Sequence, residues 1–537
     1  RHGWGDEHLY QGNDEMSGMS PPQDCQPEIL SLDEFNVAIP QDVYDLLSKQ
    51  YSALDDNDGD EETKHIDRLL KCMKRSPVDT CCRVNNIRSS VKEVEAGLEQ
   101  YFAEKIMESQ HNNSYSIQRH ETLTDLVTIR TTSATPDLYD AKVPPMTCNL
   151  PRNDVSSKQT DLFPNWQHRR KQGWPLTHRC VIVDRFCAEA VLRGADIFVK
   201  GILCADAGII ESEEVAVYAS LPRPNSTKSN PITRGMLLQN YCDRCVFIGI
   251  GISQCKRAGY FASSGTGVVM TSTACSPQPP MNGVLVGKMI LQNLPSVVVA
   301  HALNPQPNEV ILDMCCAPGG KTTHLASLMN DNGLIIACDK SRKKMISARD
   351  FFQANASCSI VPLALDSTKA LLELKSGEDW KSPHEIIDSA SIANDGLKDV
   401  KGFYANSFDR ILLDPPCSAL GLRPKLQIDT KSAKELLKAA DYQQKFIRNA
   451  VSLLKVGGSM TYSTCTINTL ENEENVKFIL KEFPCMRLES LSHLPGLPGL
   501  PDKGLTEEEC HKIRRFDPTD TSIDTMGFFL AKFQKVC

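Results

Sequence analysis

The spacing of apolar and polar positions predicts a doubly wound α/β domain over residues 276–537. Val310–Leu312 and Leu334–Cys338 are short apolar runs of the kind that form buried parallel strands. Apolar residues at helical spacing run through Ala433–Leu454, where we expect a long amphipathic helix. Lys369–Ser407 is polar, which indicates a loop insertion.

The first part of the chain shows a different pattern. Residues 1–38 are rich in Gly, Ser, Gln, Asp and Pro, and we predict a disordered tail there. Residues 39–175 contain helical patterns at Val43–Ala53, Ile66–Met73 and Val91–Phe102, followed by a long polar stretch without clear periodicity.

Residues 176–275 contain short β-branched and aromatic runs broken by glycine, such as Val181–Val183 and Val246–Gly251. Many short strands with glycine turns are typical of a small barrel. The sequence therefore predicts four segments, which are a tail (1–38), an N-terminal region (39–175), a β-barrel domain (176–275) and an α/β domain (276–537).

Four predicted strands of the α/β domain lead into an aspartate, namely Asp313, Asp339, Asp366 and Asp414. In an open parallel sheet, ligands bind outside the carboxyl ends of the strands. Asp339, after the second strand, can accept both hydroxyls of a ribose, and Asp366, after the third, can accept the exocyclic amine of an adenine. A nucleoside site without a pyrophosphate cradle favours S-adenosylmethionine (AdoMet) over NAD or ATP.

A turn of small residues follows the first of these strands. A strand, a glycine turn and a helix start form a βα unit whose backbone N–H groups suit the polar or negative part of a ligand. A P-loop would need Gly at position 315, which is Cys, and the G-x-G-x-x-G fingerprint is absent. With the strand-end acids, the predicted cofactor-binding residues are Cys315, Cys316, Ala317, Pro318, Gly319, Gly320 and Lys321.

Composition narrows the class of protein. With 537 residues, 41% of them hydrophobic, the chain has room for two or three domains. No apolar run reaches eighteen residues, so we expect no membrane span, and the polar first residues argue against a signal peptide. The 21 cysteines indicate reduced thiols of a cytoplasmic, or else nuclear, protein. The net charge of −8 means that any RNA affinity must come from local patches.

Three motifs follow one another in the α/β domain. Asp313–Thr322 reads DMCCAPGGKT, Asp414–Gly421 reads DPPCSALG and Tyr462–Thr466 reads YSTCT. In this order they resemble the motifs of the Sun-domain (Fmu-type) RNA cytosine-5 methyltransferases, over a match that runs from about Gly283 to the C-terminus. The resemblance implies a Rossmann-like methyltransferase domain, AdoMet as the cofactor and RNA as the substrate.

Cytosine C5 is a poor nucleophile, so its methylation needs a thiolate added at C6. Cys417 and Cys465 stand in the second and third motifs. DNA cytosine methyltransferases use a Pro-Cys nucleophile, which nominates Cys417. The family resemblance instead implies that Cys465 attacks and that Cys417 releases the product. It also implies that Asp414 binds the N3 side of the cytosine and that Lys321 orients Asp414 and the base.

The barrel region carries a second resemblance. Leu192–Ile202 resembles the PUA domain, a small RNA-binding pseudobarrel. One branch of the Sun-domain family, its sixth human-type member, carries a PUA domain at this place and methylates the acceptor end of transfer RNA. The resemblance therefore implies a tRNA substrate, with Arg193, Lys200 and Arg234 as candidates for phosphate contacts. The chain departs from that branch at Gly249–Gly251.

Two further stretches carry signals for RNA binding. Cys82–Asn85 resembles the Arg-Val-Asn element in the family's N-terminal RNA-binding part, and we expect residues 39–175 to form such a region. Trp166–Trp174 interleaves basic and aromatic side chains, which suits phosphates and stacked bases and equally suits a solvated basic loop.

Other functions stay open at this point. A catalytically silent RNA-binding scaffold would keep the PUA domain but should lose motif residues, and none is lost. A cytosine-5 methyltransferase acting on rRNA or mRNA would keep every motif. We expect a monomer that binds RNA, with no metal and no membrane partner.

Overall fold

The computed structural model describes residues 27–55, 64–108, 113–133, 171–221, 232–262, 264–275, 281, 283–355 and 357–537. The chain divides into two compact units. The large unit comprises residues 36–140, 192–195 and 275–537, and the small unit comprises residues 1–35, 141–191 and 196–274. No helix among the described residues is long and apolar enough to cross a membrane.

An eight-stranded sheet forms the centre of the large unit. Its order is β15-β14-β13-β16-β17-β20-β18, with β19 paired to β20. The strands from β15 to β17 in this order run parallel, and β20 runs antiparallel to its neighbours. The chain starts at β13, moves outward to β15 and returns to β16 on the other side of β13, so the strand order reverses between β13 and β16. The strands are β13 (Val310–Asp313), β14 (Leu334–Cys338), β15 (Ile360–Leu363), β16 (Phe408–Leu413), β17 (Leu454–Thr464), β18 (Met486–Glu489), β19 (Arg514–Phe516) and β20 (Phe528–Lys535).

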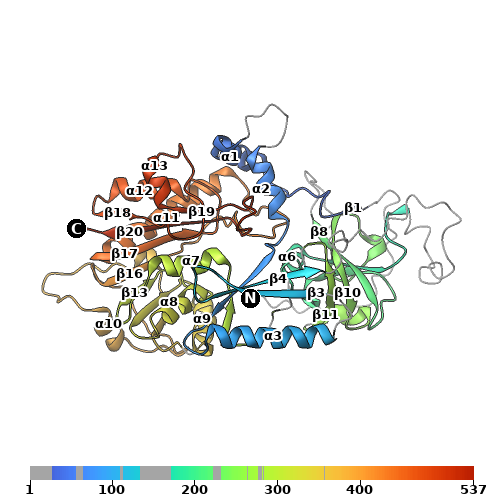
Figure 1. Ribbon diagram of the computed structural model, residues 1–537, viewed down its shortest axis with the longest axis horizontal. Coiled ribbons are helices and arrows are strands. Elements are labelled where there is room, and N and C mark those ends of the chain that lie inside the picture. The colour runs from blue at the N-terminus through green and yellow to red at the C-terminus, as the bar shows by residue number, and fades with distance from the viewer. Residues whose placement is uncertain are drawn as a thin grey trace. The chain divides into compact units, whose positions relative to one another are not determined.

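Helices cover both faces of this sheet (Figure 1). One apolar core lies between the strands and α7, α8 and α9, and a second core lies between the strands and α10, α11 and α12. This arrangement confirms the predicted Rossmann-like α/β domain and its long helix. The helices are α7 (Leu294–Leu303), α8 (Gly320–Leu328), α9 (Arg342–Ala354), α10 (Pro383–Ser389), α11 (Ala433–Leu453), α12 (Glu473–Glu482) and α13 (Glu507–Lys512).

A second, four-stranded sheet of the large unit has the order β12-β2-β4-β3. Helix α3 packs on it through buried Val94, Leu98 and Phe102. The three predicted helices of the N-terminal region are confirmed within a few residues. The elements are α1 (Gln41–Tyr51), α2 (His65–Met73), β2 (Asp79–Val84), α3 (Val91–Glu108), β3 (Asn113–Arg119), β4 (Leu126–Ser133) and β12 (Met289–Leu291).

The small unit is a mixed β structure of short strands, as the glycine-broken pattern predicted. Its order is β6-β11-β10-β8-β5-β7-β9, with β1 paired to β10. The core contains several aromatic side chains. The rings of Trp174 and Tyr218 pack edge to face, with their centroids 5.4 Å apart. The elements are β1 (Glu28–Leu30), β5 (Arg179–Val183), α6 (Arg185–Val191), β6 (Ile197–Phe198), β7 (Ile202–Ala205), β8 (Glu214–Leu221), β9 (Met236–Leu237), β10 (Arg244–Ser253) and β11 (Thr266–Thr273).

Three predictions from local composition are wrong. The predicted tail to residue 38 contains β1, which pairs in parallel with β10, and Phe35, which is buried under Arg244. A three-residue strand is too short to show periodicity, and its stability comes from its partner strand. The expected loop insertion at Lys369–Ser407 contains α10, whose N-terminus has a capping box formed by Ser382 and Glu385.

Trp174 is the third case. We expected it to belong to an RNA-binding patch, but its side chain is buried in the small unit's core. Residues 166–170 of that patch lie outside the described residues. Among the described cysteines, eighteen are free thiols, as expected, whereas Cys242 is disulfide-bonded and corrects the expectation of a fully reduced set.

Candidate active site

The carboxyl ends of the parallel strands meet at one edge of the large sheet, and the segments after them form the candidate site. Residues 315–320, which we call the cofactor loop, follow β13. Cys316 donates its backbone N–H to the carbonyl of Cys338 at the end of β14, at 2.8 Å. The Ser367 hydroxyl donates to the carbonyl of Met314 at 2.8 Å and so ties the segment after β15 to the same place.

Asp313 holds the cofactor loop in shape. Its carboxylate accepts hydrogen bonds from the Thr322 hydroxyl at 2.7 Å and from the Cys315 amide at 3.2 Å. The side chain is buried, and burial raises the pKa of Asp313 to about 7. Gly319 has a φ of +116°, and a Cβ there would lie 2.6 Å from the Phe352 ring, so the turn requires glycine. The predicted strand, glycine turn and helix are confirmed.

Asp339 and Asp366 stand where the sequence placed them, directly beyond β14 and close behind β15. Oδ1 of Asp339 accepts from the Ser341 amide at 2.8 Å. Oδ1 of Asp366 accepts from the amide and the hydroxyl of Thr368, at 3.1 and 2.6 Å. Carboxylates oriented at adjacent strand ends suit the hydroxyls and amine of a nucleoside, and the helix start at Gly320 offers N–H groups to its polar group. The residues present fit AdoMet.

Two thiols lie side by side at the ends of neighbouring strands. Cys417 comes three residues after Asp414, which directly follows β16, and Cys465 directly follows β17. Their Sγ atoms are 3.3 Å apart, and both residues are half-buried. Lys321 Nζ lies 2.6 Å from Oδ2 of Asp414, and Oδ1 of Asp414 accepts from the Ser463 hydroxyl at 2.8 Å. The structure therefore brings the four predicted catalytic residues together.

The two thiols differ in acidity. The hydrogen bond from the Cys417 thiol lowers the pKa of Cys465 despite burial, and the Lys321 ammonium acts in the same direction. The same hydrogen bond, burial and the negative charge of Glu471 raise the pKa of Cys417 well above its ordinary value. Burial alone would lower the pKa of Lys321, but the charge of Asp414 outweighs it and raises that pKa. Cys465 is therefore the thiol that loses its proton more readily.

The cofactor-loop thiols have a different character. Burial raises the pKa of Cys315 and of Cys316 well above the ordinary value of a thiol, with the Asp313 carboxylate adding to the effect. Both side chains therefore stay protonated at neutral pH and contribute packing, whereas Cys417 and Cys465 remain the candidates for the chemistry.

Arg83, of the Arg-Val-Asn element, lies in the interior of the large unit. Its side chain is fully buried, and its guanidinium donates to Gln292 Oε1 at 2.8 Å and to Thr323 Oγ1 at 2.9 Å. A longer bond of 3.4 Å reaches the carbonyl of Gly320. Gln292 precedes α7, whereas Gly320 and Thr323 belong to the start of α8. The RNA-binding role expected for the N-terminal region stays a prediction. Arg83 braces the cofactor loop from behind.

A buried polar cluster supports the same helix. Asp125 accepts hydrogen bonds from Nε2 of His301 and Nε2 of His324, each at 2.7 Å. The ligand-type atoms of these three residues lie within 4.8 Å of one another, a spacing that could hold a metal ion. The distances are those of direct hydrogen bonds, and the nearby charge of Arg83 opposes a cation. These features favour a hydrogen-bonded network that joins α7 and α8.

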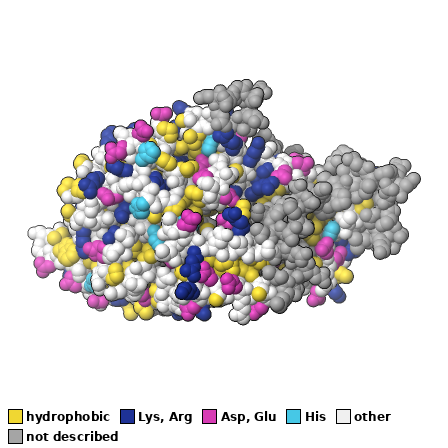
Figure 2. All heavy atoms as spheres, viewed as in Figure 1, with side chains coloured by type: hydrophobic (Ala, Val, Ile, Leu, Met, Phe, Trp, Pro, Cys, Tyr) yellow, Lys and Arg dark blue, Asp and Glu magenta, His cyan; other side chains and the backbone are white. Residues whose placement is uncertain are grey.

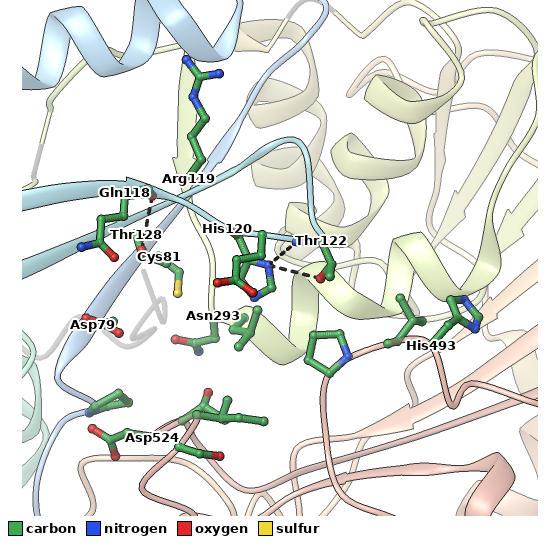
Figure 3. A pocket seen from close by; sticks show the side chains of 18 residues that line it. Asp79, Cys81, Gln118, Arg119, His120, Thr122, Thr128, Asn293, His493 and Asp524 are labelled. Carbon is green, nitrogen blue, oxygen red and sulfur yellow. Dashed lines mark hydrogen bonds between the residues drawn. The ribbon is translucent and has the colours of Figure 1, made fainter.

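A cavity of about 560 Å³ lies between the N-terminal sheet and the loops that follow β18 and β19. Figure 3 shows its polar lining, with the His120 ring turned toward Thr122 and with Asn293 nearby. Two of its carboxylates are already engaged, because Asp79 pairs with Arg130 and Asp524 pairs with Arg423. None of the predicted catalytic or cofactor-binding residues lines this cavity, so we assign it no part in the chemistry.

The candidate RNA contacts differ in their surroundings. Arg193 and Lys200 are exposed. The Arg234 guanidinium is instead committed to backbone carbonyls, including those of Val199, Tyr260 and Ala262 at 3.0 to 3.1 Å. The guanidinium is thus already hydrogen-bonded to the backbone while the residue itself is exposed, and a phosphate contact by Arg234 stays a prediction. Acidic and basic side chains are interspersed over the described part of the face in Figure 2.

The fold and the strand-edge residues define a Rossmann-like methyltransferase with an attached RNA-binding domain. A family model described as 16S rRNA methyltransferase RsmB/F matches residues 300–360 and 386–534, and a PUA domain model matches residues 180–238. The chain belongs to the RsmB/F family of AdoMet-dependent RNA cytosine-5 methyltransferases. The resemblance stated from the motifs is confirmed.

Individual relatives extend this comparison over most of the chain. The rRNA (cytosine-C(5))-methyltransferase NOP2C of Arabidopsis thaliana is 33% identical over an alignment of 555 positions that covers 87% of each chain. The tRNA (cytosine(72)-C(5))-methyltransferase NSUN6 of Mus musculus is 33% identical over 501 residues, covering 88% of this chain and 91% of its own length. The crystal structure of NSun6 from Pyrococcus horikoshii with SFG matches 93% of this chain and 99% of its own, with a TM-score of 0.61 at 24% identity.

Proposed function

We propose that this chain methylates C5 of a cytosine near the 3′ acceptor end of transfer RNA, with Cys465 as the nucleophile and Cys417 as the residue that releases the product. One observation carries the catalytic part of this proposal. Two thiols of unequal acidity lie 3.3 Å apart at the ends of β16 and β17, beside the ion pair of Lys321 and Asp414.

The geometry supports different roles for the two thiols in attack and in release. The Cys465 thiolate adds to C6 of the cytosine, and the electron pair of the C5–C6 bond becomes available at C5. The cofactor loop, Asp339 and Asp366 would hold AdoMet, which would supply the methyl group to C5 as its sulfur–methyl bond breaks and S-adenosylhomocysteine leaves. Asp414, held by Lys321 and Ser463, binds the N3 side of the base while the adduct exists.

Release requires the reverse bond change. A base removes the remaining proton from C5, the C5–C6 double bond forms again, and the electron pair of the sulfur–C6 bond returns to Cys465. The C5 proton passes to a water molecule, and the protonated Cys417 thiol, 3.3 Å from the Cys465 sulfur, assists release by donating its hydrogen bond to the departing Cys465 thiolate. The nucleophile and the releasing group are thus different residues.

The substrate is argued from the PUA domain and from the cost of exposing a base. A cytosine must leave its stack to reach the thiols, at a cost of a few kcal/mol that is least near a frayed end. A PUA domain gripping a single-stranded end would set a fixed distance from that end to the site. Ribosomal RNA is the second candidate, because the Arabidopsis relative is as similar as the mouse one. We expect a monomer that acts in the cytoplasm or nucleus.

The test compares three RNAs with one enzyme preparation. Bisulfite sequencing should find methylation near the 3′ end of intact tRNA, a sharp loss on tRNA without its single-stranded 3′ tail, and little on rRNA fragments. Lys200→Glu and Arg193→Glu should weaken tRNA binding while AdoMet affinity stays unchanged, because phosphate pairing supplies affinity. Full activity on tailless tRNA would contradict the proposed end recognition, and preferential methylation of rRNA fragments would favour the second candidate.

A further inference from the structure

One buried carboxylate is attached to the loop that carries Cys417. Glu471, which lies just before α12, is fully buried. Its Oε2 accepts the backbone N–H of Ser418 at 2.9 Å, and its Oε1 accepts the Ser418 hydroxyl at 2.5 Å. Ser418 directly follows Cys417. The amide and the hydroxyl of this neighbouring residue therefore both donate to Glu471.

Two amides complete the surroundings of Glu471. Gln443 Nε2 donates to Oε2 at 2.8 Å, and Asn468 Nδ2 donates to Oε1 at 2.9 Å. Gln443 also donates to the carbonyl of Pro416, on the other side of Cys417, at 3.1 Å. The backbone is therefore held on both sides of the Cys417 side chain.

The same network reaches the second thiol. The hydroxyls of Ser418 and Thr466 are 2.7 Å apart, and Thr466 directly follows Cys465. Because a carboxylate only accepts, Ser418 gives its proton to Glu471 and Thr466 donates to Ser418. Asn472 holds the other side, since it donates to the carbonyl of Thr466 at 3.0 Å and accepts from the Thr464 hydroxyl at 2.5 Å.

We propose that Glu471 is a positioning residue that sets the approach of Cys417 to Cys465 through Ser418 and thereby controls release of the methylated cytosine. The proposal rests on the roles proposed above for the two cysteines. Glu471 touches neither sulfur. It acts by fixing the loop at Ser418, and its charge, next to Cys417, helps to keep that thiol protonated as the donor to Cys465.

Glu471→Gln tests this role without changing the size of the side chain. All four hydrogen bonds to the carboxylate come from donors, so an amide N–H₂ faces donors whichever way it turns. The Cys417 loop should move, and a displacement of about 1 Å can reduce a rate by roughly 100-fold. The variant should accumulate covalently bound RNA on denaturing gels, turn over roughly 100-fold more slowly and keep its AdoMet affinity.

Two companion variants sharpen the experiment. Ser418→Ala keeps the buried carboxylate and three of its four hydrogen bonds, those from the residue 418 amide, Gln443 and Asn468. It should therefore fold even if Glu471→Gln does not. It should also accumulate covalently bound RNA, but less than Glu471→Gln. Glu474→Gln makes the same chemical change three residues further on, at an exposed position in the first turn of α12, and should behave as wild type.

Cys417→Ala and Cys465→Ala, run alongside, separate this inference from the proposed function. If Cys417→Ala traps RNA while the Glu471 and Ser418 variants turn over normally, the role of Glu471 is wrong and the cysteine roles stand. If Cys417→Ala traps no RNA, the roles proposed for the two cysteines are wrong. The pH dependence of Cys465 alkylation then tests whether Glu471 positions Cys417 against Cys465. The midpoint pH of Cys465 alkylation should rise in Glu471→Gln and not in Glu474→Gln. An unchanged midpoint in Glu471→Gln would overturn the inference.

Discussion

Replacing His324 by Gln should make the region around α8 less sensitive to acid. His324 is fully buried and donates through Nε2 to Oδ2 of Asp125 at 2.7 Å. A Gln side chain places an amide N–H near the position of Nε2, so the hydrogen bond is kept while the titrating ring is removed. Burial and the charge of Arg83 lower the pKa of His324 from 6.5 to about 4.

The sign follows from proton binding in the two states. Between pH 6.5 and pH 4 the unfolded chain protonates this histidine and the folded chain does not, so stability falls as the pH drops through that window. The ordinary pKa of histidine, 6.5, lies about 1.5 units above pH 5. At 1.36 kcal/mol per unit, the loss of folding stability at pH 5 is about 2 kcal/mol. Asp125 stays ionised across this window, because hydrogen bonds from His301 and His324 outweigh burial and hold its pKa far below its ordinary value.

Native-state hydrogen exchange read by mass spectrometry suits this measurement, because a chain with several domains has no single unfolding free energy. Opening free energies of the α8 amides are compared at pH 7 and pH 5. The wild type should lose about 2 kcal/mol more than His324→Gln. His511→Gln, at an exposed position on α13, serves as the matched control and should follow the wild type. Equal losses in the wild type and His324→Gln would refute a neutral buried histidine.

Two further variants test the cofactor edge and the acidity of the nucleophile. Asp339→Ala should weaken AdoMet binding by about 10- to 100-fold in calorimetry, the cost of hydrogen bonds to a charged group, and an unchanged affinity would remove the assignment. Lys321→Met removes the ammonium that helps to lower the pKa of Cys465. The midpoint pH of Cys465 alkylation should therefore rise and methylation at pH 7 should fall, and an unaltered pH profile would show that Lys321 has no such effect.

The candidate reacting groups could be located from the sequence because they follow strands in local motifs. Asp339, Cys417 and Cys465 could each be placed at a strand end from a few neighbouring residues. The fold class was accessible for the same reason, since apolar runs and helical spacing are local patterns.

The supporting residues could not be found in this way. Arg83 bonds to side chains 209 and 240 residues later in the chain, and no short motif reveals such partners. Glu471 reads as an ordinary acid before a helix, and only the fold brings it to Ser418, 53 residues earlier. Trp174 stands beside basic residues in the sequence, yet its ring packs against Tyr218 of β8, because burial depends on the assembled sheet.

The central claim is that Cys465 attacks the cytosine and Cys417 releases it. The most direct measurement incubates Cys417→Ala and Cys465→Ala with AdoMet and substrate tRNA, separates the products on denaturing gels and maps any RNA-linked peptide by mass spectrometry. Cys417→Ala should accumulate an adduct on the peptide that contains Cys465, and Cys465→Ala should form neither adduct nor 5-methylcytosine. An adduct on Cys417 in the Cys465→Ala variant, with none in Cys417→Ala, would contradict the account and exchange the two roles.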